Sequence, residues 1–279
     1  MQTQVLIIGA GPAGVSCAIW LHKLGVACVL LEASGRAGGL QILSPYENLW
    51  VPGVQGKTGQ DIARALDDHV GALGIDMRVD CPALRIEPEW KVTTPQGEMI
   101  APFVVLATGT RPRTGGFTPS ATVAIGPGTP VEDMDVAGRD VAVLGGGDNA
   151  FDQARFLAER GAHPVVFSRT SPRAQKGLQT LIPNVTAVVG GYDADQVAMT
   201  VNGNRFDLFA VMYGFEALLP PGIAPALDRG YVTVDRFGET SLPGLFACGE
   251  VTDYWHPCVT TACAHGIQVA KQISLRLAD

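Results

Sequence analysis

The same glycine pattern occurs twice in this chain, each time between an apolar run and a segment with helical periodicity. The first copy, Gly9–Gly14, is GAGPAG and follows the apolar run Val5–Ile8. The second copy, Gly145–Ala150, is GGGDNA and follows Val141–Leu144. In a strand–turn–helix unit, the first glycine permits a tight turn, the second lets a diphosphate approach the backbone, and the third small residue lets the helix pack on the strand. The repeated pattern therefore predicts two nucleotide-binding turns.

The segments around these turns indicate the fold class and the domain boundaries. The 279 residues are enough for two domains, and apolar runs alternate with amphipathic segments, as is typical of strand–helix–strand units. We therefore expect an α/β fold with two Rossmann-like dinucleotide-binding domains. Proline- and glycine-rich segments at Thr110–Ser120 and Leu218–Pro225 indicate the linkers. The expected domains are residues 1–111 together with 226–279, and residues 112–225.

Charge and cysteine content exclude several classes of partner and site. The formal net charge of −7 argues against nucleic acid or an anionic membrane as a partner. No apolar run approaches the roughly 18 residues of a membrane span, and the first residues carry no secretory pattern, so we expect a cytoplasmic location. The six cysteines contain no C-x-x-C pair, and no spacing of cysteine and histidine predicts a metal site.

A carboxylate follows the first turn at the distance that ribose recognition requires. Glu32 ends the next apolar run, about 20 residues further on, where an acid accepts hydrogen bonds from a ribose 2′-hydroxyl. The helix that begins after Gly11 directs the positive end of its dipole at the phosphates. The first turn therefore predicts a dinucleotide site with all of its usual parts.

Five further motifs, in family order, resemble segments of the low-molecular-weight thioredoxin reductases. GGLQ and YENLWVPG resemble the stretch that contacts the flavin, and ATG resembles the strand that returns under the FAD. GLFACGEVTD resembles the second FAD signature, and HPCVTTACAHG resembles the start of the C-terminal helix beside the flavin ring. GGGDNAFDQA is similar to its counterpart in thioredoxin-reductase-like ferredoxin–NADP reductases. The five motifs are Gly38–Gln41, Tyr46–Gly53, Ala107–Gly109, Gly244–Asp253 and His256–Gly266.

The resemblance implies that the first domain binds FAD. It also reveals a departure, because Glu250 stands where the family usually has aspartate. The helix that begins near Val259 would direct its N-terminus at the pyrimidine edge of the flavin, which favours the anionic reduced form. The residues that the resemblance places along FAD are Gly9, Gly11, Pro12, Ala13, Gly14, Glu32, Gly39, Gln41, Asn48, Ala107, Thr108, Gly109, Gly249, Glu250, Cys258, Val259 and Thr260.

The second turn predicts a site for NADPH. SRTSPR follows the next apolar run without a carboxylate, and arginine pairs with a 2′-phosphate that a carboxylate would repel. The alternative is a relic domain that keeps its shape and binds nothing, because the span between Arg173 and Tyr213 leaves little room for the usual strands. The candidate NADPH residues are Gly145, Gly147, Asp148, Asn149, Ala150, Arg169 and Arg173.

The cysteine pair through which thioredoxin reductases pass electrons is missing. An ungapped alignment on the second turn places Gly128–Val131 at that position. The resemblance therefore implies an FAD-dependent oxidoreductase that NAD(P)H reduces and that passes electrons to an unidentified small-molecule or protein acceptor. The alternatives are a flavin enzyme that does not use NAD(P)H, either an oxidase or a protein-fed reductase, and a non-catalytic flavoprotein that senses redox state. We also expect a homodimer.

Two side chains near the expected flavin ring are candidates for catalysis. His256 has a side chain that exchanges protons near pH 7. Cys258 lies where the closing helix is expected to begin, and a helix N-terminus stabilises a thiolate. A packing role is the alternative for each residue, the histidine as a cap and the cysteine as a small apolar side chain.

Overall fold

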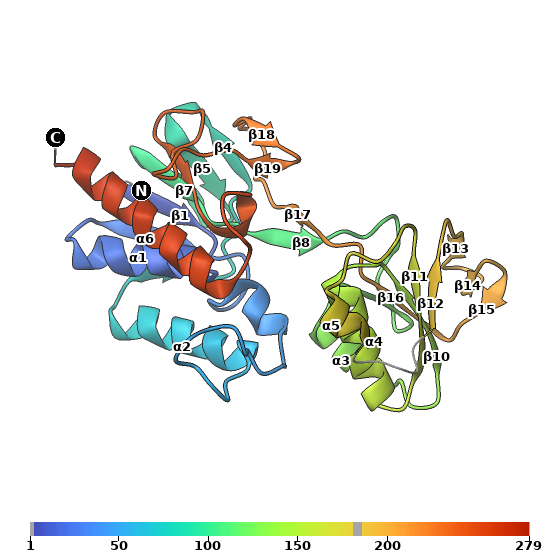
Figure 1. Cartoon of the computed structure of the whole chain (residues 1–279). Coiled ribbons are helices and arrows are strands. Elements are labelled where there is room, and N and C mark those ends of the chain that lie inside the picture. Colours follow the sequence, from blue (N-terminus) through green and yellow to red (C-terminus); the bar gives the residue numbers. More distant parts are fainter. Residues whose placement is uncertain (1–2, 181–185, 279) are drawn as a thin grey trace. The chain divides into compact units, whose positions relative to one another are not determined.

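The computed structural model describes residues 3–180 and 186–278, and the chain forms two compact units (Figure 1). The first unit contains Met1–Arg111 and Glu216–Asp279, and the second unit contains Pro112–Phe215. Each unit is built on a parallel sheet with helices packed against it. The α/β class with two Rossmann-like units, expected from the sequence, is confirmed.

The segment that the sequence analysis assigned to the second linker belongs to the first unit. Leu218 N–H donates a hydrogen bond to the Gly109 carbonyl (3.0 Å), and Ile86 N–H donates one to the Pro221 carbonyl (2.9 Å). These bonds hold an apolar, proline-rich segment against the rest of the first unit. A linker would instead run through solvent. The structure therefore ends the second unit at Phe215, where the sequence analysis expected residue 225.

The first unit has a five-stranded parallel sheet with the order β20-β7-β1-β2-β3. Its central strands are continuous apolar runs because both faces are covered. Ile7 and Phe246 belong to the core on one face, and Leu6 and Leu106 belong to the core on the other. The strands are β1 (Val5–Ile8), β2 (Cys28–Leu31), β3 (Asp76–Arg78), β7 (Phe103–Leu106) and β20 (Leu245–Ala247).

Two helices of the first unit pack directly on each other. α1 (Pro12–Lys23) and α6 (Val259–Arg276) lie side by side (Figure 1). A Cβ atom at Gly266 would lie 2.1 Å from the Ala13 carbonyl oxygen, so glycine is required where the two backbones meet. α2 (Gly59–Ala72) begins with a capping box. In the part of the chain that the structure describes, no helix is both long and apolar enough to cross a membrane.

The remaining elements of the first unit are short. An antiparallel meander, β4-β5-β6, covers the core formed by Leu6 and Leu106. The chain leaves the unit through β8 (Thr110–Pro112) and returns through β17 (Phe215–Ala217), which pair with each other. The other short elements are β4 (Arg85–Glu87), β5 (Lys91–Thr94), β6 (Gly97–Ile100), β18 (Leu227–Asp228), β19 (Tyr231–Val232) and the 3₁₀ helices Gly39–Leu43, Pro88–Trp90 and Gly249–Val251.

The second unit has a five-stranded parallel sheet with the order β12-β11-β10-β16-β9. The expected shortage of room after Arg173 is not found, since α5, β12 and a three-stranded antiparallel sheet precede β16. The elements are β9 (Val123–Ile125), α3 (Thr129–Glu132), β10 (Asp140–Leu144), α4 (Asp148–Glu159), β11 (His163–Ser168), α5 (Lys176–Thr180), β12 (Thr186–Val189), β13 (Ala194–Asp195), β14 (Thr200–Val201), β15 (Asn204–Arg205) and β16 (Leu208–Val211).

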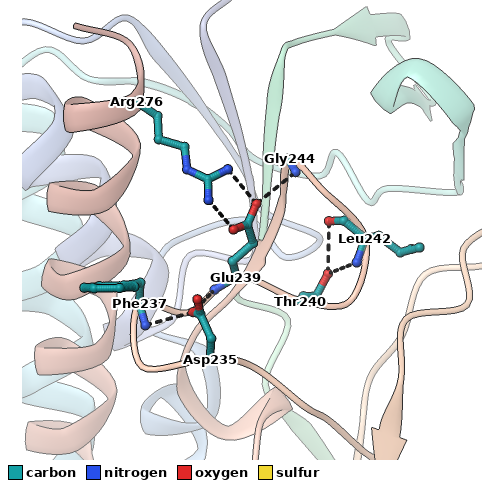
Figure 2. A network of polar contacts seen from close by, with 7 residues as sticks. All are labelled: Asp235, Phe237, Glu239, Thr240, Leu242, Gly244 and Arg276. Atoms are coloured by element: carbon teal, nitrogen blue, oxygen red, sulfur yellow. Dashed lines mark hydrogen bonds and ion pairs between the residues drawn. The ribbon is translucent and has the colours of Figure 1, made fainter. Parts of the chain in front are cut away.

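The last turn of α6 is held by a network of polar contacts (Figure 2). Arg276 pairs with both carboxylate oxygens of Glu239, and Glu239 Oε1 also accepts a hydrogen bond from Gly244 N–H (3.3 Å). Asp235 Oδ1 accepts hydrogen bonds from the N–H groups of Phe237 (2.8 Å) and Glu239 (2.9 Å). The network therefore joins α6 to the segment that leads into β20, and a cation at this helix end also interacts favourably with the helix dipole.

We expect Glu239→Ala to lower the free energy of unfolding by about 1–3 kcal/mol, because it removes a two-pronged ion pair and the acceptor of Gly244 N–H. Urea unfolding measures the change. Asp135→Ala is the matched control, since its ion pair with Arg139 is exposed and long (3.7 Å); its expected cost is below about 0.5 kcal/mol. Equal losses in both variants would contradict the role of Glu239.

Candidate functional site

A cavity of about 580 Å³ opens at the carboxyl ends of the strands in the first unit. Gly9, Glu32, Ala107 and Cys248 line it, and each of them directly follows a strand of the parallel sheet. Ligands of open α/β sheets usually bind at this edge, and the volume lies in the range of small-molecule and cofactor sites. The cavity is therefore the candidate functional site of the first unit.

The structure brings most of the residues expected to contact FAD into this cavity. Gly14 lies behind the turn, and Asn48 and Thr260 are not part of the lining. The residues from the expected set that line the cavity are Gly9, Gly11, Pro12, Ala13, Glu32, Gly39, Gln41, Ala107, Thr108, Gly109, Gly249, Glu250, Cys258 and Val259.

Each of the three glycines in the first turn is needed for a different structural reason. Gly9 has a positive φ of 103°, and a Cβ atom there would lie 2.4 Å from the Ala107 carbonyl oxygen. A Cβ atom at Gly14 would lie 1.9 Å from the Gly9 carbonyl oxygen, so this glycine allows α1 to pack on the turn. At Gly11 the nearest atom to such a Cβ is Gly39 Cα at 3.8 Å, so the space beside this glycine stays open to a ligand.

Two helix N-termini point at the cavity. The first residues of α1 and of α6 line it, and neither helix has an acidic residue in its first turn. Free N–H groups and the helix dipoles therefore favour an anionic ligand. Cys258 caps α6: its Sγ accepts a hydrogen bond from Thr261 N–H (3.5 Å), and its own N–H donates to Thr261 Oγ1 (3.2 Å).

The carboxylate of Glu32 is buried and oriented at the end of β2. Oε2 accepts a hydrogen bond from Ala10 N–H (2.7 Å), and Oε1 accepts hydrogen bonds from the N–H and the hydroxyl of Ser34 (both 2.8 Å). A carboxylate offers about four lone-pair sites, so Oε2 keeps capacity for one more donor. The side chain both stabilises the glycine turn and offers an acceptor to a ribose hydroxyl.

Two further polar side chains fit a ligand that donates hydrogen bonds. Gln41 lines the cavity, and its Oε1 is buried with no hydrogen-bond partner among the described residues, an arrangement that costs free energy until a donor arrives. Burial raises the pKa of Glu250, an effect that the hydrogen bond from Thr110 Oγ1 (3.2 Å) opposes. With the anion-favouring helix ends, these groups fit a diphosphate cofactor rich in hydroxyl and N–H groups, which is the chemistry of FAD.

Two residues expected at the site have other positions. Asn48 Oδ1 accepts hydrogen bonds from the N–H groups of Trp50 (3.1 Å) and Val51 (3.2 Å), and so folds its own loop. His256 is exposed, and it is not among the residues that line the cavity. Of the two catalytic candidates, only Cys258 lies at the cavity.

A histidine that the sequence analysis missed supports the cavity wall. His265 lies on the buried face of α6, and its Nδ1 accepts a hydrogen bond from Gly249 N–H (3.2 Å). The rings of Tyr254 and Trp255 lie 5.4 and 5.6 Å from its imidazole. Burial lowers the pKa of His265 to about 4, so the imidazole is neutral at pH 7 and able to accept this bond. Its only signal in the sequence is a polar residue on the apolar side of the closing helix.

The second glycine turn has the same backbone construction as the first. A Cβ atom at Gly145 would lie 2.2 Å from the Met212 carbonyl oxygen, whereas the space beside Gly147 is open. Arg173 N–H donates a hydrogen bond to the Gly146 carbonyl (2.7 Å), so the loop after β11 lies against the turn. The turn is therefore formed, and one of the two candidate arginines adjoins it.

The start of α4 differs from the starts of α1 and α6. Ala150 is buried against the core, while Asp148 and Asn149 are exposed in the first turn. The Asp148 carboxylate accepts hydrogen bonds from the backbone N–H (2.7 Å) and the side-chain amide (3.3 Å) of Gln175. Arg169 directly follows β11 and is exposed. These residues leave one helix N-terminus and two arginines on the same edge of the sheet.

We expect the pH dependence of stability to report on His265. Its pKa is about 4 in the folded chain and near 6.5 in an unfolded chain, so the unfolded chain binds more protons between these values. The contribution of the neutral imidazole is therefore complete above about pH 6.5 and is lost as the pH falls towards 4. Of this contribution, about 2 kcal/mol is lost between pH 7.5 and pH 5.0, and urea unfolding at these two pH values measures the loss.

His265→Asn is the informative variant, because an amide oxygen can replace the Nδ1 acceptor and does not titrate. Its stability should fall less between pH 7.5 and 5.0 than that of the wild type. His256→Asn, at an exposed position, is the matched control and should keep the wild-type pH dependence. The same pH dependence in all three proteins would rule out the buried neutral imidazole.

Comparisons with known proteins agree with this geometry. The sequence pattern of the family described as pyridine nucleotide-disulphide oxidoreductase matches residues 3–268. The chain is 27% identical to a ferredoxin–NADP reductase of Burkholderia vietnamiensis, over 91% of this chain and 82% of that protein. It is also 27% identical to a thioredoxin reductase of Peptoclostridium acidaminophilum, over 96% of this chain and 95% of that protein.

A solved structure with the same fold is that of Lactococcus lactis thioredoxin reductase in its FR conformation. The TM-score is 0.84 at 22% identity, and 99% of each chain is covered. The resemblance stated from the sequence motifs is therefore confirmed. The chain belongs to the pyridine nucleotide-disulphide oxidoreductase family, and it is a flavin-dependent oxidoreductase.

Proposed function

We propose that the first unit binds FAD in its cavity, that the second unit binds NADPH, and that electrons pass from the flavin directly to an acceptor outside the chain. Members of this family use FAD and NADPH. When bound, FAD would supply the redox chemistry, namely the exchange of two electrons between reduced nicotinamide and an acceptor. The observation that carries the proposal is the cavity itself. A glycine turn, two helix N-termini without acidic residues and a buried hydrogen-bond acceptor without a partner among the described residues all lie at it.

The lining residues would have separate tasks in binding FAD. The N–H groups at the start of α1, beside the open space at Gly11, would bind the diphosphate. Glu32 would accept the ribose hydroxyl, and Gln41 Oε1 and Glu250 would take up donors from the rest of the cofactor. The N-terminus of α6 would favour negative charge on the reduced ring.

The acceptor is expected to react at the flavin itself. The chain has no cysteine between Cys81 and Cys248. At the position of the thioredoxin reductase relay, Gly128 caps the short helix α3, and Val131 is buried in the core. We infer that this chain is not a thioredoxin reductase, although relatives with that name share its fold. Relatives named for ferredoxin and NADP support an acceptor that needs no cysteine pair.

Cys258 is the side chain that we propose beside the reacting ring. It is half-buried, lines the cavity and caps α6, so its thiol is fixed by the helix that would face the flavin. His256 has no such position, because its side chain is exposed. The thiol of Cys258 is therefore available to contact the ring system or an incoming acceptor.

We expect the purified protein to be yellow, with FAD close to one per chain, and anaerobic NADPH to bleach the flavin faster than NADH. Absorbance in stopped flow measures both rates.

Gly11→Val should lower FAD affinity on the order of tenfold or more, because the side chain fills the space that the diphosphate needs. Gly71→Ala is the control, since nothing lies near its Cβ position. Colourless protein that takes up no FAD would refute the proposal, and flavin that NADPH does not bleach would favour another donor or a sensor.

We expect no reduction of thioredoxin by NADPH above the background rate, because the cysteine relay is absent. We also expect a long-wavelength charge-transfer band in the flavin spectrum that disappears in Cys258→Ser and persists in Cys263→Ala. Absorption spectra between pH 5 and 9 measure the band. Thioredoxin reduction at rates typical of thioredoxin reductases would show that another relay exists. Identical spectra in the wild type and Cys258→Ser would assign Cys258 to packing alone.

A further inference from the structure

We propose that Tyr192 and Tyr213 are positioning residues that hold the guanidinium of Arg169 ready to bind the 2′-phosphate of NADPH. The two rings, called here the tyrosine shelf, would thereby determine the preference of the second unit for NADPH over NADH. This inference rests on the proposed NADPH site.

Three strand ends bring these side chains together. Arg169 directly follows β11, Tyr213 follows β16 and Tyr192 follows β12. The guanidinium carbon of Arg169 lies 5.1 Å from the ring centroid of Tyr213 and 5.6 Å from that of Tyr192. Both distances are within the range of a cation–π interaction. All three residues lie at the carboxyl edge of the parallel sheet, where nucleotides bind in folds of this kind.

The tyrosine shelf is itself fixed by its surroundings. The two hydroxyl groups form a hydrogen bond of 3.1 Å, and the ring of Tyr192 packs on Phe167 (5.6 Å). A Cβ atom at Gly115 would lie 2.3 Å from the Tyr213 ring, so the backbone lies directly against that ring. Burial raises the pKa of Tyr192, so its phenol stays neutral. The shelf is therefore a support for a cation that its own surroundings hold in place.

The contact with the two rings leaves donors on Arg169 for an anion. A guanidinium has five N–H donors, so the hydrogen bond that Arg169 also makes with the Tyr192 side chain leaves others for two-pronged bonds to phosphate. The side chain of Arg169 is exposed, and in the part of the chain that the structure describes no carboxylate pairs with it. Arg169 therefore has a fixed position and an unneutralised charge, which are the two properties that a preformed phosphate receptor needs.

The registers of the two sheets indicate which part of the nucleotide this receptor faces. β1 and β2 pair Ile8 with Leu31, and β10 and β11 pair Leu144 with Phe167. Ser168 therefore occupies in the second unit the position that Glu32 occupies in the first. An acid at this position accepts the ribose 2′-hydroxyl. A neutral serine followed by a fixed arginine fits a ribose that carries a phosphate there.

The test compares a nucleotide that carries the 2′-phosphate with one that lacks it, using the FAD-loaded protein and no turnover. Calorimetry with 2′,5′-ADP and with 5′-AMP gives a ratio of affinities for each variant. Tyr213→Leu should lower this ratio about 3- to 10-fold and leave the affinity for 5′-AMP unchanged. Tyr213→Phe keeps the ring face and should stay within about twofold of the wild type. Phe156→Leu is the matched control, because its ring lies under Arg160, 5.2 Å away, elsewhere in the same unit.

Arg169→Lys keeps the test decisive if Tyr213→Leu does not fold, because the position is exposed. Lysine keeps the charge but loses both the contact of the guanidinium with the rings and the two-pronged bonds to phosphate, so the ratio should fall at least as far as it does in Tyr213→Leu. A wild-type ratio in Arg169→Lys, or in a folded Tyr213→Leu, would overturn the role of the tyrosine shelf. A wild type that binds 2′,5′-ADP no better than 5′-AMP would instead refute the proposed NADPH site, and the role of the shelf with it.

Discussion

Direct contact between backbones determines the geometry on which the rest of the first unit depends. The missing Cβ atoms of Gly14 and Gly266 would lie 1.9 Å from the Gly9 carbonyl oxygen and 2.1 Å from the Ala13 carbonyl oxygen. α1 can therefore pack on the turn after β1, and α6 can pack on α1. This packing brings both helix N-termini to one cavity, because a side chain at either glycine would separate the elements and move the N–H groups that face the ligand.

The parts that the sequence predicts well are those determined by neighbouring residues. A continuous apolar run predicts a strand buried on both faces, and a glycine turn after it predicts the tight turn and the helix that follows. The two turns, the strands beside them and α1, α4 and α6 are found at the expected positions. The place of Glu32 at the end of β2 can also be predicted from the sequence, because it depends only on the length of one strand–helix–strand unit.

The parts that the sequence predicts poorly depend on contacts between distant segments. The hydrogen bond between Gly249 and His265 joins a strand end to the middle of a helix, so no local pattern distinguishes His265 from a packed histidine. Leu218–Pro221 has the composition of a linker. Its hydrogen bonds with Gly109 and Ile86 make it part of the wall of the cavity in the first unit. Asn48 lies in a motif shared with the family, yet its side chain is used by its own turn.

The chain leaves the first unit unfinished while it builds the second. On the ribosome, the second unit is complete once Phe215 has been made, but the first unit still lacks β20 and α6. Until these elements arrive, the edge of β7 has no partner strand, and the face of α1 that α6 covers is open to water. Exposed strand edges and apolar faces promote aggregation. The synthesis of residues 216–279 is therefore the interval in which the first unit exposes a strand edge and an apolar helix face that the finished fold covers.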